Sequence, residues 1–206
     1  MRKLLLAAVL ALSVPTTSQA IVSLGLRLGV GFPGGDVVKD SKYSDGLSSQ
    51  VPVQVDVMFG GSSLQLGIYA GWALNNVKKD AFGPGTTGTS STMRAGVQVT
   101  SEFVDLGLVG VWAGLGTGYE SLQVDVTTPF GKAEQTLRGW EFATLSAGAD
   151  LKFIPLISVG LYGSAAFGQF NTFTQKDPSG ETSGGLGPDK AIHQMYTIGL
   201  RGALNL

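Results

Sequence analysis

Residues 64–74 have the sequence LQLGIYAGWAL, in which apolar side chains occupy every second position. This alternation is the period of a β-strand, because successive side chains of a strand point to opposite faces of the sheet. A strand that crosses a membrane needs about 9–11 residues of this pattern. The stretch therefore predicts one membrane-spanning strand.

Seven further segments repeat the alternation, so the sequence predicts eight strands in all. The segments lie at 23–32, 51–59, 93–103, 109–116, 145–153, 158–167 and 196–206. The start of the sixth strand is ambiguous, because Trp140 and Phe142 are out of phase with Leu145, and a β-bulge would explain the change of phase. We predict an all-β fold, an eight-stranded antiparallel transmembrane β-barrel that closes between residues 21–32 and 192–206.

The connections between these strands alternate in length. Four are long and polar, and they contain 17 of the 29 charged residues. They lie at 33–49, 76–91, 121–138 and 171–190, and the three short connections lie at 60–63, 102–105 and 154–156. Such alternation is typical of barrels with long extracellular loops and short periplasmic turns. The third long loop, around 128–131, is a candidate hairpin that carries its strands above the membrane.

The first 20 residues have the three parts of a secretory signal peptide. Arg2 and Lys3 supply positive charge, residues 4–14 are mainly apolar, and small residues lead to an expected cleavage site after Ala20. The alternative is an uncleaved anchor helix, but the apolar run is shorter than the roughly 20 residues that a spanning helix needs. We expect an exported protein with one barrel domain at 21–206.

Composition narrows the class of protein. Charged residues make up 14% of the chain, whereas an ordinary soluble domain carries about 25%. The chain contains no Cys, which excludes disulfides and thiolate metal sites. A net charge of −1 offers no basic face for nucleic acid. The sequence predicts no cofactor and no metal site.

A soluble secreted barrel of lipocalin type would also show alternating strands. Its polar face would meet water and be rich in Lys, Glu and Asp, whereas here that face is mostly Gly, Ser, Thr and Gln, which suits a packed lumen. Phe59, Phe103 and Phe153 end the strands that lead into the short turns, and they share the phase of the apolar face. We interpret them as a periplasmic aromatic rim. The last predicted strand also continues to Leu206, which again favours the membrane version.

Five charged residues fall on the polar face of the predicted strands: Arg27, Asp56, Arg94, Asp150 and Arg201. Isolated charges in a narrow lumen are costly, so these residues should pair. Arg27 and Arg201 lie at similar depth on the first and last strands, which are neighbours in a closed barrel, so anions are expected between them. We predict a lumenal cluster of Arg27, Arg201, Asp56 and Asp150 that blocks a continuous water channel, with Arg94 as a substitute from above. A gated ion pathway is the alternative.

The chain resembles the eight-stranded outer-membrane barrels of the OmpA transmembrane-domain and OmpX type over residues 21–206. The resemblance rests on the number of strands, the alternation of loops, the segment WAGLGTGYE at 112–120 and the closing strand YTIGLRGALNL at 196–206. It implies the outer membrane of a Gram-negative bacterium, with outer-membrane lipids and lipopolysaccharide as partners. The closing strand is similar to the signal recognised by the barrel-assembly machinery, although members usually end in Phe and this chain ends in Leu206.

His193 is the one histidine of the sequence, at the entry to the last strand. Lipid-A deacylases of this architecture pair such a histidine with a serine two residues later, whereas position 195 here is Met. A solvated histidine at the rim is therefore favoured, and we predict no catalytic residues and no enzyme activity.

Two classes of function remain ahead of catalysis. One is a structural surface protein that contributes to envelope integrity. The other is a binding module whose loops contact a surface ligand, with Tyr43, Phe82, Phe130 and Phe173 as candidate anchors. A lipid-modifying enzyme or a narrow ion pore is the alternative.

Overall fold

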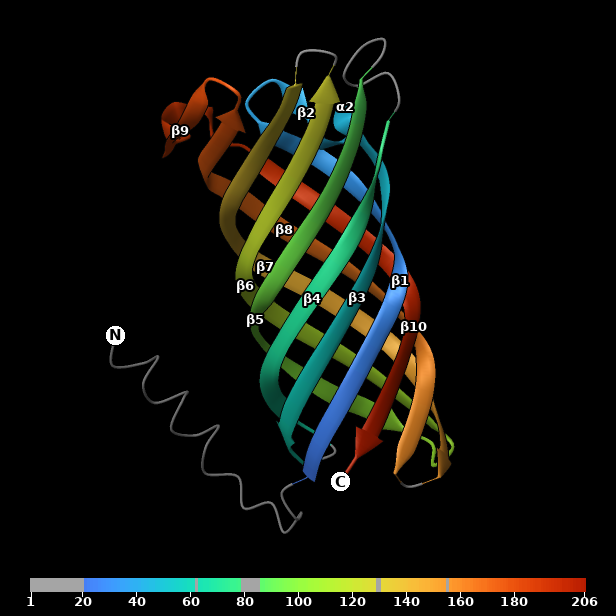
Figure 1. Ribbon diagram of the computed structural model, residues 1–206. Coiled ribbons are helices and arrows are strands. Elements are labelled where there is room, and N and C mark those ends of the chain that lie inside the picture. Colours follow the sequence, from blue (N-terminus) through green and yellow to red (C-terminus); the bar gives the residue numbers. More distant parts are fainter. Residues whose placement is uncertain (1–20, 62, 79–85, 129–130, 155) are drawn as a thin grey trace, which may run out of the picture.

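The computed structural model describes residues 21–61, 63–78, 86–128, 131–154 and 156–206. Eight antiparallel strands form a closed ring (Figure 1). In chain order these are β1 (Ile21–Val38), β3 (Leu47–Gly60), β4 (Gln65–Val77), β5 (Thr87–Asp105), β6 (Val109–Thr128), β7 (Gly131–Ile154), β8 (Ile157–Asp177) and β10 (Ile192–Asn205). The ring closes because β10 pairs with both β1 and β8. The predicted fold and number of barrel strands are confirmed.

Short elements occupy the long connections at one end of the barrel. They are β2 (Ser41–Lys42), the single-turn helix α2 (Tyr43–Gly46), β9 (Gly180–Gly185) and the 3-10 turn η2 (Gly187–Asp189). At the opposite, short-turn end, the beginning of β1 lies beside the end of β10 (Figure 1). Among the described residues, no helix is long and apolar enough to cross a membrane.

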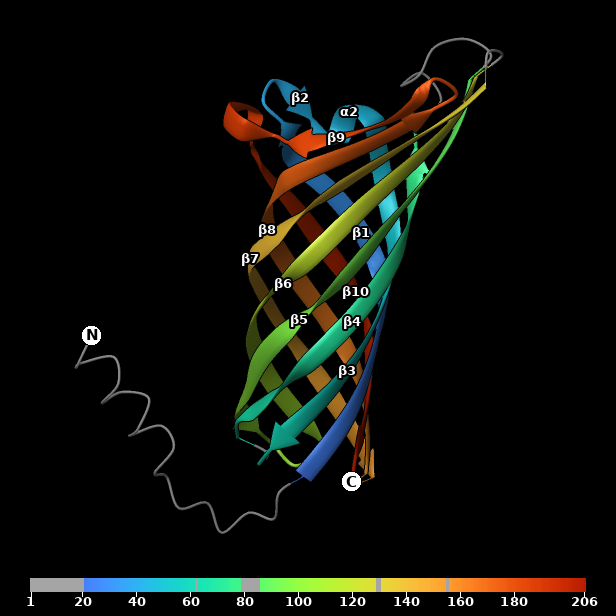
Figure 2. The ribbon, with the colours of Figure 1, turned by 60° about the vertical axis from the view of Figure 1, so that its left-hand side comes forward.

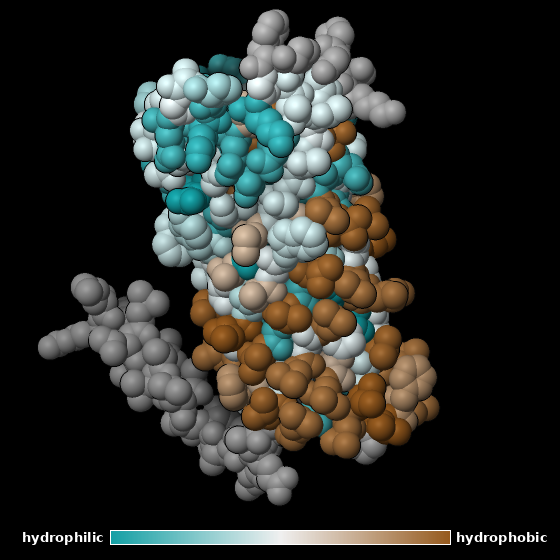
Figure 3. Space-filling view, viewed as in Figure 1, coloured by the Kyte–Doolittle hydropathy of each residue, from teal (hydrophilic) through white to brown (hydrophobic). Residues whose placement is uncertain are grey.

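The alternation of the sequence becomes an alternation of burial. In β4, Leu66 and Ile68 are exposed on the outside of the barrel, whereas Gly67 and Tyr69 are buried in the lumen. The outward apolar side chains of successive strands merge into a broad apolar band toward the short-turn end (Figure 3). Polar residues dominate the exterior at the other end in the same view.

A bulge in β7 resolves the ambiguous phase of the sixth strand. The register between β7 and β8 shifts between Glu141 and Ala143. Trp140, Phe142 and Leu145 therefore all reach the outside, although they do not share one alternating phase. The predicted bulge is present, and it allows the strand to begin at Gly131.

The second short turn lies further along the chain than the sequence indicated. We predicted the turn at 102–105, but β5 continues to Asp105 and the turn occupies residues 106–108. The register of β5 against β6 shifts between Glu102 and Val104, so the extra residue is absorbed while pairing continues.

The third long loop is mostly strand. β6 and β7 remain paired up to Thr128 and Gly131, which confirms the candidate hairpin at this position, and β8 continues into pairing with β9. We call residues 121–138 and 172–185 the extension. Figure 2 shows it rising beyond the shorter strands β3 and β4.

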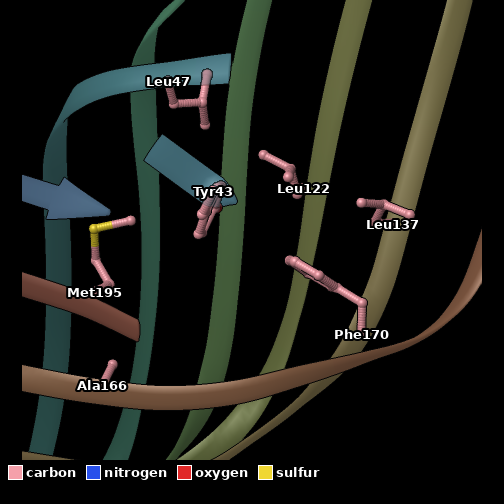
Figure 4. Packing of buried hydrophobic residues seen from close by; sticks show 7 residues of the cluster. All are labelled: Tyr43, Leu47, Leu122, Leu137, Ala166, Phe170 and Met195. Carbon is pink, nitrogen blue, oxygen red and sulfur yellow. The ribbon is translucent and has the colours of Figure 1, made fainter. Parts of the chain in front are cut away.

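An apolar cluster fills the barrel where the extension begins. We call it the upper core, and its buried members are Tyr43, Leu47, Leu122, Leu137, Ala166, Phe170 and Met195 (Figure 4). Tyr43 comes from α2, so the first long connection folds back into the barrel mouth. Phe170 is fully buried.

Candidate functional site

Among the described residues, the buried charged side chains lie in the lumen of the barrel. In the lower part of the lumen, toward the short turns, the guanidinium of Arg27 lies 3.1 Å from a carboxylate oxygen of Asp56. The side-chain amide of Gln98 also donates to Asp56, at 2.9 Å. Arg201 forms an ion pair with Asp150, and the indole N–H of Trp112 donates to Asp150 at 3.1 Å. The four predicted residues thus form two buried ion pairs.

Arg27 and Arg201 are direct cross-strand partners on β1 and β10. The ring of Trp112 lies within reach of both guanidinium groups, at 5.2 Å from the Arg27 carbon and 4.6 Å from the Arg201 carbon. The electron-rich face of an aromatic ring attracts cations, so one ring offsets part of the repulsion between the two arginines. We expected carboxylates between the cations, and the structure places this indole near both while the aspartates pair with one cation each.

A second charged layer lies above these pairs. Arg94 pairs with Glu141 rather than replacing a member of the lower group. The hydroxyl of Tyr69 donates to Glu141 at 2.9 Å, and Thr144 also contacts that carboxylate. A buried charge with several partners of this kind holds the strands in one register, because any slip would leave it unpaired.

A third layer joins Glu120 on β6 to His193 on β10 across the barrel. His193 is 3% exposed, so the expectation of a solvated rim histidine was wrong. Its ring stacks on Phe170 with centroids 4.3 Å apart, and Tyr43 meets it edge-on at 5.6 Å. Gly168 makes the pair possible, because a Cβ there would lie 2.5 Å from Glu120 and 2.7 Å from His193. The upper core therefore covers the histidine.

A fourth network lies at the short-turn end. The ammonium of Lys152 is 2.6 Å from Glu102 and 3.0 Å from Asp105. These groups are partly exposed, so their contribution to stability is small. Beside them, a cavity of about 180 Å³ opens toward the turns, with Trp112, Asp150 and Arg201 among its lining residues.

The space left between the layers is very small. The cavity beside Arg27, Gln98 and Glu141 has a volume of about 20 Å³, and that beside Glu120 and His193 about 10 Å³. A cavity needs roughly 10–15 Å³ to hold one water. These two spaces have room for isolated waters and not for a column of water. A larger cleft of about 470 Å³ lies between α2 and the inner face of the extension, and Tyr43, Leu47, Leu122 and Leu137 of the upper core form part of its wall.

The three phenylalanines of the proposed periplasmic rim point outward near the short turns. Phe59, Phe103 and Phe153 are 54%, 63% and 68% exposed. Aromatic side chains also gather at the other limit of the apolar band, where Phe32 pairs with Tyr196 across β1 and β10. On β6 and β7, Tyr119 and Trp140 form an edge-to-face pair with centroids 5.5 Å apart.

The separation of these two aromatic levels suits a membrane. Val22, the cross-strand partner of Phe59, and Phe32 are ten residues apart on β1. At about 3.3 Å per residue and a tilt near 40°, they differ in height by about 25 Å. This is roughly the height of the apolar band of outer-membrane barrels.

Sequence reasoning missed Glu120, Glu141 and the partnership of His193. Glu141 lies between Trp140 and Phe142, and Glu120 follows Tyr119. An acidic residue beside an outward aromatic residue must point inward, so this local pattern was the available signal. It was overlooked because the bulge in β7 obscured the phase of that strand and because Glu120 borders the predicted third loop.

The candidate loop anchors divide into two groups. Tyr43 is buried in the upper core, and Phe173 packs against that core. Neither residue is therefore the exposed anchor that the sequence predicted. Phe82 and Phe130 lie outside the described residues. The expected signal peptide at 1–20 also lies outside them. In the part of the chain that the structure describes, no group of His, Asp and Glu side chains could hold a metal ion.

The closed antiparallel ring, its apolar exterior and its polar lumen define a small β-barrel of the outer-membrane type. No protein-family model matches the sequence, and no curated protein matches it. Solved structures do match. A major outer membrane protein from Thermus thermophilus aligns with a TM-score of 0.60 and 15% identity, over 90% of this chain and 99% of that one.

Two further solved structures are similar to this chain. The outer membrane protein OprG from Pseudomonas aeruginosa has a TM-score of 0.55 and 10% identity, over 91% of this chain and 97% of that one. The outer membrane protein AlkL, solved in lipid bilayers, has a TM-score of 0.55 and 11% identity, over 94% of this chain and 93% of that one. At these identities the likeness establishes the fold, which is that of the small outer-membrane barrels that the sequence resembles.

Proposed function

We propose that the protein is a non-conducting barrel of the outer membrane of a Gram-negative bacterium, and that its role lies at the cell surface. The single observation that carries the proposal is the closure of the lumen by successive charged layers and by the upper core. A barrel of eight strands has an interior just wide enough for side chains to fill. In this chain, charged and aromatic side chains occupy that interior.

The exterior supports the location. The apolar band lies between two levels of aromatic residues, and its height matches the hydrocarbon region of a bilayer. The partners of this surface are the lipids of the outer membrane and lipopolysaccharide. The closing strand at 196–206 is the candidate signal for the barrel-assembly machinery during biogenesis.

The extension supports the role at the surface. It raises β6, β7 and β8 beyond the shorter strands β3 and β4 (Figure 2). Its outward positions include the polar residues Gln123, Asp125 and Arg138. A rigid paired sheet displays a binding face more reproducibly than a loose loop. We therefore favour a surface-binding role over a purely structural one.

Catalysis is not part of the proposal. Glu120 and His193 are the nearest approach to an acid–base pair, but both are buried and the upper core covers them. Met195, in the position of the serine of the deacylases, belongs to that core.

Conductance tests the closed lumen. The purified protein in planar lipid bilayers should give no current above that of the bare bilayer, and a pore-forming peptide added afterwards verifies that the bilayer can conduct. The matched variant carries Asp56→Asn and Asp150→Asn. A steady wild-type conductance would contradict the closed lumen, and a conductance that persists unchanged in this variant would show in addition that the lower ion pairs do not control it.

A second experiment separates the two roles. A strain that lacks the protein is complemented with the wild type or with a variant in which Gln123, Asp125 and Arg138 are replaced by Ser. These residues lie on the outer face of the extension, so the barrel should still fold. We expect the variant to restore detergent resistance but not surface adhesion. Full adhesion by the variant, with detergent sensitivity only when the barrel is absent, would favour the structural role.

A further inference from the structure

Two leucines project from the turn between β5 and β6. Leu106 and Leu108 are each 73% exposed, and no large apolar side chain of the described residues is more exposed. Short turns of outer-membrane barrels ordinarily meet the aqueous periplasm, where a pair of exposed leucines is unfavourable. Their position therefore needs a specific explanation.

The backbone of this turn is unusually tight. The N–H of Leu108 donates to the carbonyl of Leu106 at 3.0 Å, which encloses the single residue Gly107 in a γ-turn. Gly107 has a φ of 79°, a left-handed conformation that glycine adopts without a Cβ clash. The N–H of Leu106 donates to the carbonyl of Val109 at 2.9 Å, which closes the hairpin around the turn.

Five of the six backbone polar groups of residues 106–108 have partners within the protein, and the carbonyl of Gly107 is the exception. The N–H of Gly107 donates to the carboxylate of Asp105 at 2.9 Å, and the carbonyl of Leu108 accepts from the N–H of Lys152 at 2.9 Å. Asp105 is itself held by the ammonium of Lys152. A segment can enter lipid only when its backbone N–H and carbonyl groups have partners, because lipid offers none. The three amide N–H groups of Leu106, Gly107 and Leu108 meet this condition.

The leucines continue a wider apolar surface. The neighbouring apolar side chains at this end that are also exposed are Phe103, Phe153, Ile154, Leu156, Leu204 and Leu206. The turn between β3 and β4 also exposes one leucine, Leu64, at 53%, but its other described residues are Gly60, Gly61 and the exposed Ser63. The tip of the turn between β5 and β6 thus presents two leucines beside the Asp105–Lys152 ion pair, whereas Gly61 and Ser63 precede the single leucine of the turn between β3 and β4.

We propose that the turn of Leu106, Gly107 and Leu108 is a lipid anchor that inserts into the inner leaflet of the outer membrane, while the turn at 60–64 remains in water. The inference rests on the proposed membrane location. The outward positions of β6 from Val109 to Tyr119 contain one polar side chain before Tyr119 itself, Thr117, whose hydroxyl donates to the carbonyl of Glu141 at 2.8 Å. The eleven steps along the chain from Leu108 to Tyr119 correspond to a height of about 28 Å, slightly more than the roughly 25 Å of the apolar band, so the leucines lie just below its lower boundary when Tyr119 lies at the upper one.

Single-cysteine spin labelling tests the anchor, since the chain has no native cysteine. The full chain is reconstituted in phospholipid vesicles, with a nitroxide at Leu106→Cys, Leu108→Cys, Ser63→Cys or Leu161→Cys. Leu161 faces outward within the apolar band and reports on the membrane location itself. Collision rates with oxygen, which concentrates in lipid, and with a water-soluble nickel chelate are compared.

We expect oxygen to dominate at 106, 108 and 161, and nickel to dominate at 63, with at least a several-fold difference in the ratio of the two rates. Nickel dominance at 106 and 108 with oxygen dominance at 161 would overturn the anchor and leave the membrane location intact. Nickel dominance at 161 would overturn both. Shielding of 106 and 108 from both reagents would show that a protein surface covers them, which also overturns a lipid anchor. Because the turn carries two separate label sites, Leu106→Cys and Leu108→Cys, the test can still be made if one of these variants fails to fold.

Discussion

On β6 and β7 the lumen face below Glu120 is polar and the outer face is apolar, whereas above Glu120 the two faces exchange their character. On β6, Trp112 and Glu120 point inward while Leu115 and Tyr119 point outward. Two residues further along the same inward face lies Leu122, which is buried, and the outward positions become Ser121 and Gln123. The strand continues without a break in pairing across this level.

The exchange follows from the solvent outside the barrel. Lipid tails are as apolar as leucine, so in the membrane the lower lumen (Arg27, Asp56, Asp150 and Arg201) is held by ion pairs and hydrogen bonds rather than by the hydrophobic effect. Water surrounds the extension, so burial of apolar area holds the upper core. One strand is thus stabilised by two different kinds of interaction along its length.

The largest expected effect tests the lower lumen. Asp150→Ala leaves Arg201 unpaired beside Arg27 and removes the acceptor of the Trp112 indole. We expect the free energy of unfolding, measured with urea in detergent micelles, to fall by about 4 kcal/mol. Adding Arg201→Met removes the uncompensated charge and should recover most of the loss. A double variant as unstable as the single one would show that the ion pair is not the cause.

A core truncation tests the upper region. Leu122→Ala should lower the free energy of unfolding by about 3 kcal/mol, because it leaves a cavity in the upper core. Leu115→Ala is the matched control on the same strand, where lipid or detergent fills the vacated space, so its cost should be smaller. Equal costs in a urea titration would contradict the distinction between the two regions.

The smallest expected effect is a loss of folding stability at alkaline pH, and it involves Tyr43. Burial, followed by the nearby Glu120 carboxylate, raises the pKa of the Tyr43 phenol well above its ordinary value of 10.0. The neutral phenol therefore favours the folded state. Its contribution is complete below pH 10 and decreases as the pH rises further, because the unfolded chain ionises first.

We expect this contribution to fall by up to about 1.4 kcal/mol for each pH unit above 10. Urea titrations at pH 9 and pH 11 should show a smaller loss of stability in Tyr43→Phe than in the wild type. The other tyrosines are common to both proteins, so the difference isolates Tyr43. Identical losses would mean that the phenol is not held in the upper core.

The sequence was sufficient for the barrel and for the inward orientation of its lower charged residues. Alternation over 64–74 and its counterparts predicted the strands because the side-chain period of a strand is independent of tertiary context. The same period placed Arg27 and Arg201 on one face, and ring closure made them neighbours. Their detailed partners did not follow, because strand shear and the position of Trp112 are set by the assembled barrel.

The upper region was much less predictable. Leu122 and Leu137 belong to a stretch that appeared as a polar loop, since its outward residues are charged or polar and the solvent changes along the strand. The insertion of Tyr43 depends on how a four-residue helix folds back, for which alternation gives no signal. His193 appeared solvated for the same reason, because its cover comes from α2 and β8.

The exchange of faces at Glu120 also fixes the barrel along the membrane normal. If the barrel sank by two residues, Ser121 and the exposed cation Arg138 would approach the hydrocarbon, and a cation on the lipid face becomes more costly with depth. If it rose, Tyr119 and Trp140 would leave the interface for water. Displacement in either direction is opposed, so the extension stands at a constant height above the bilayer. A surface ligand would therefore contact the extension at a fixed distance from the membrane.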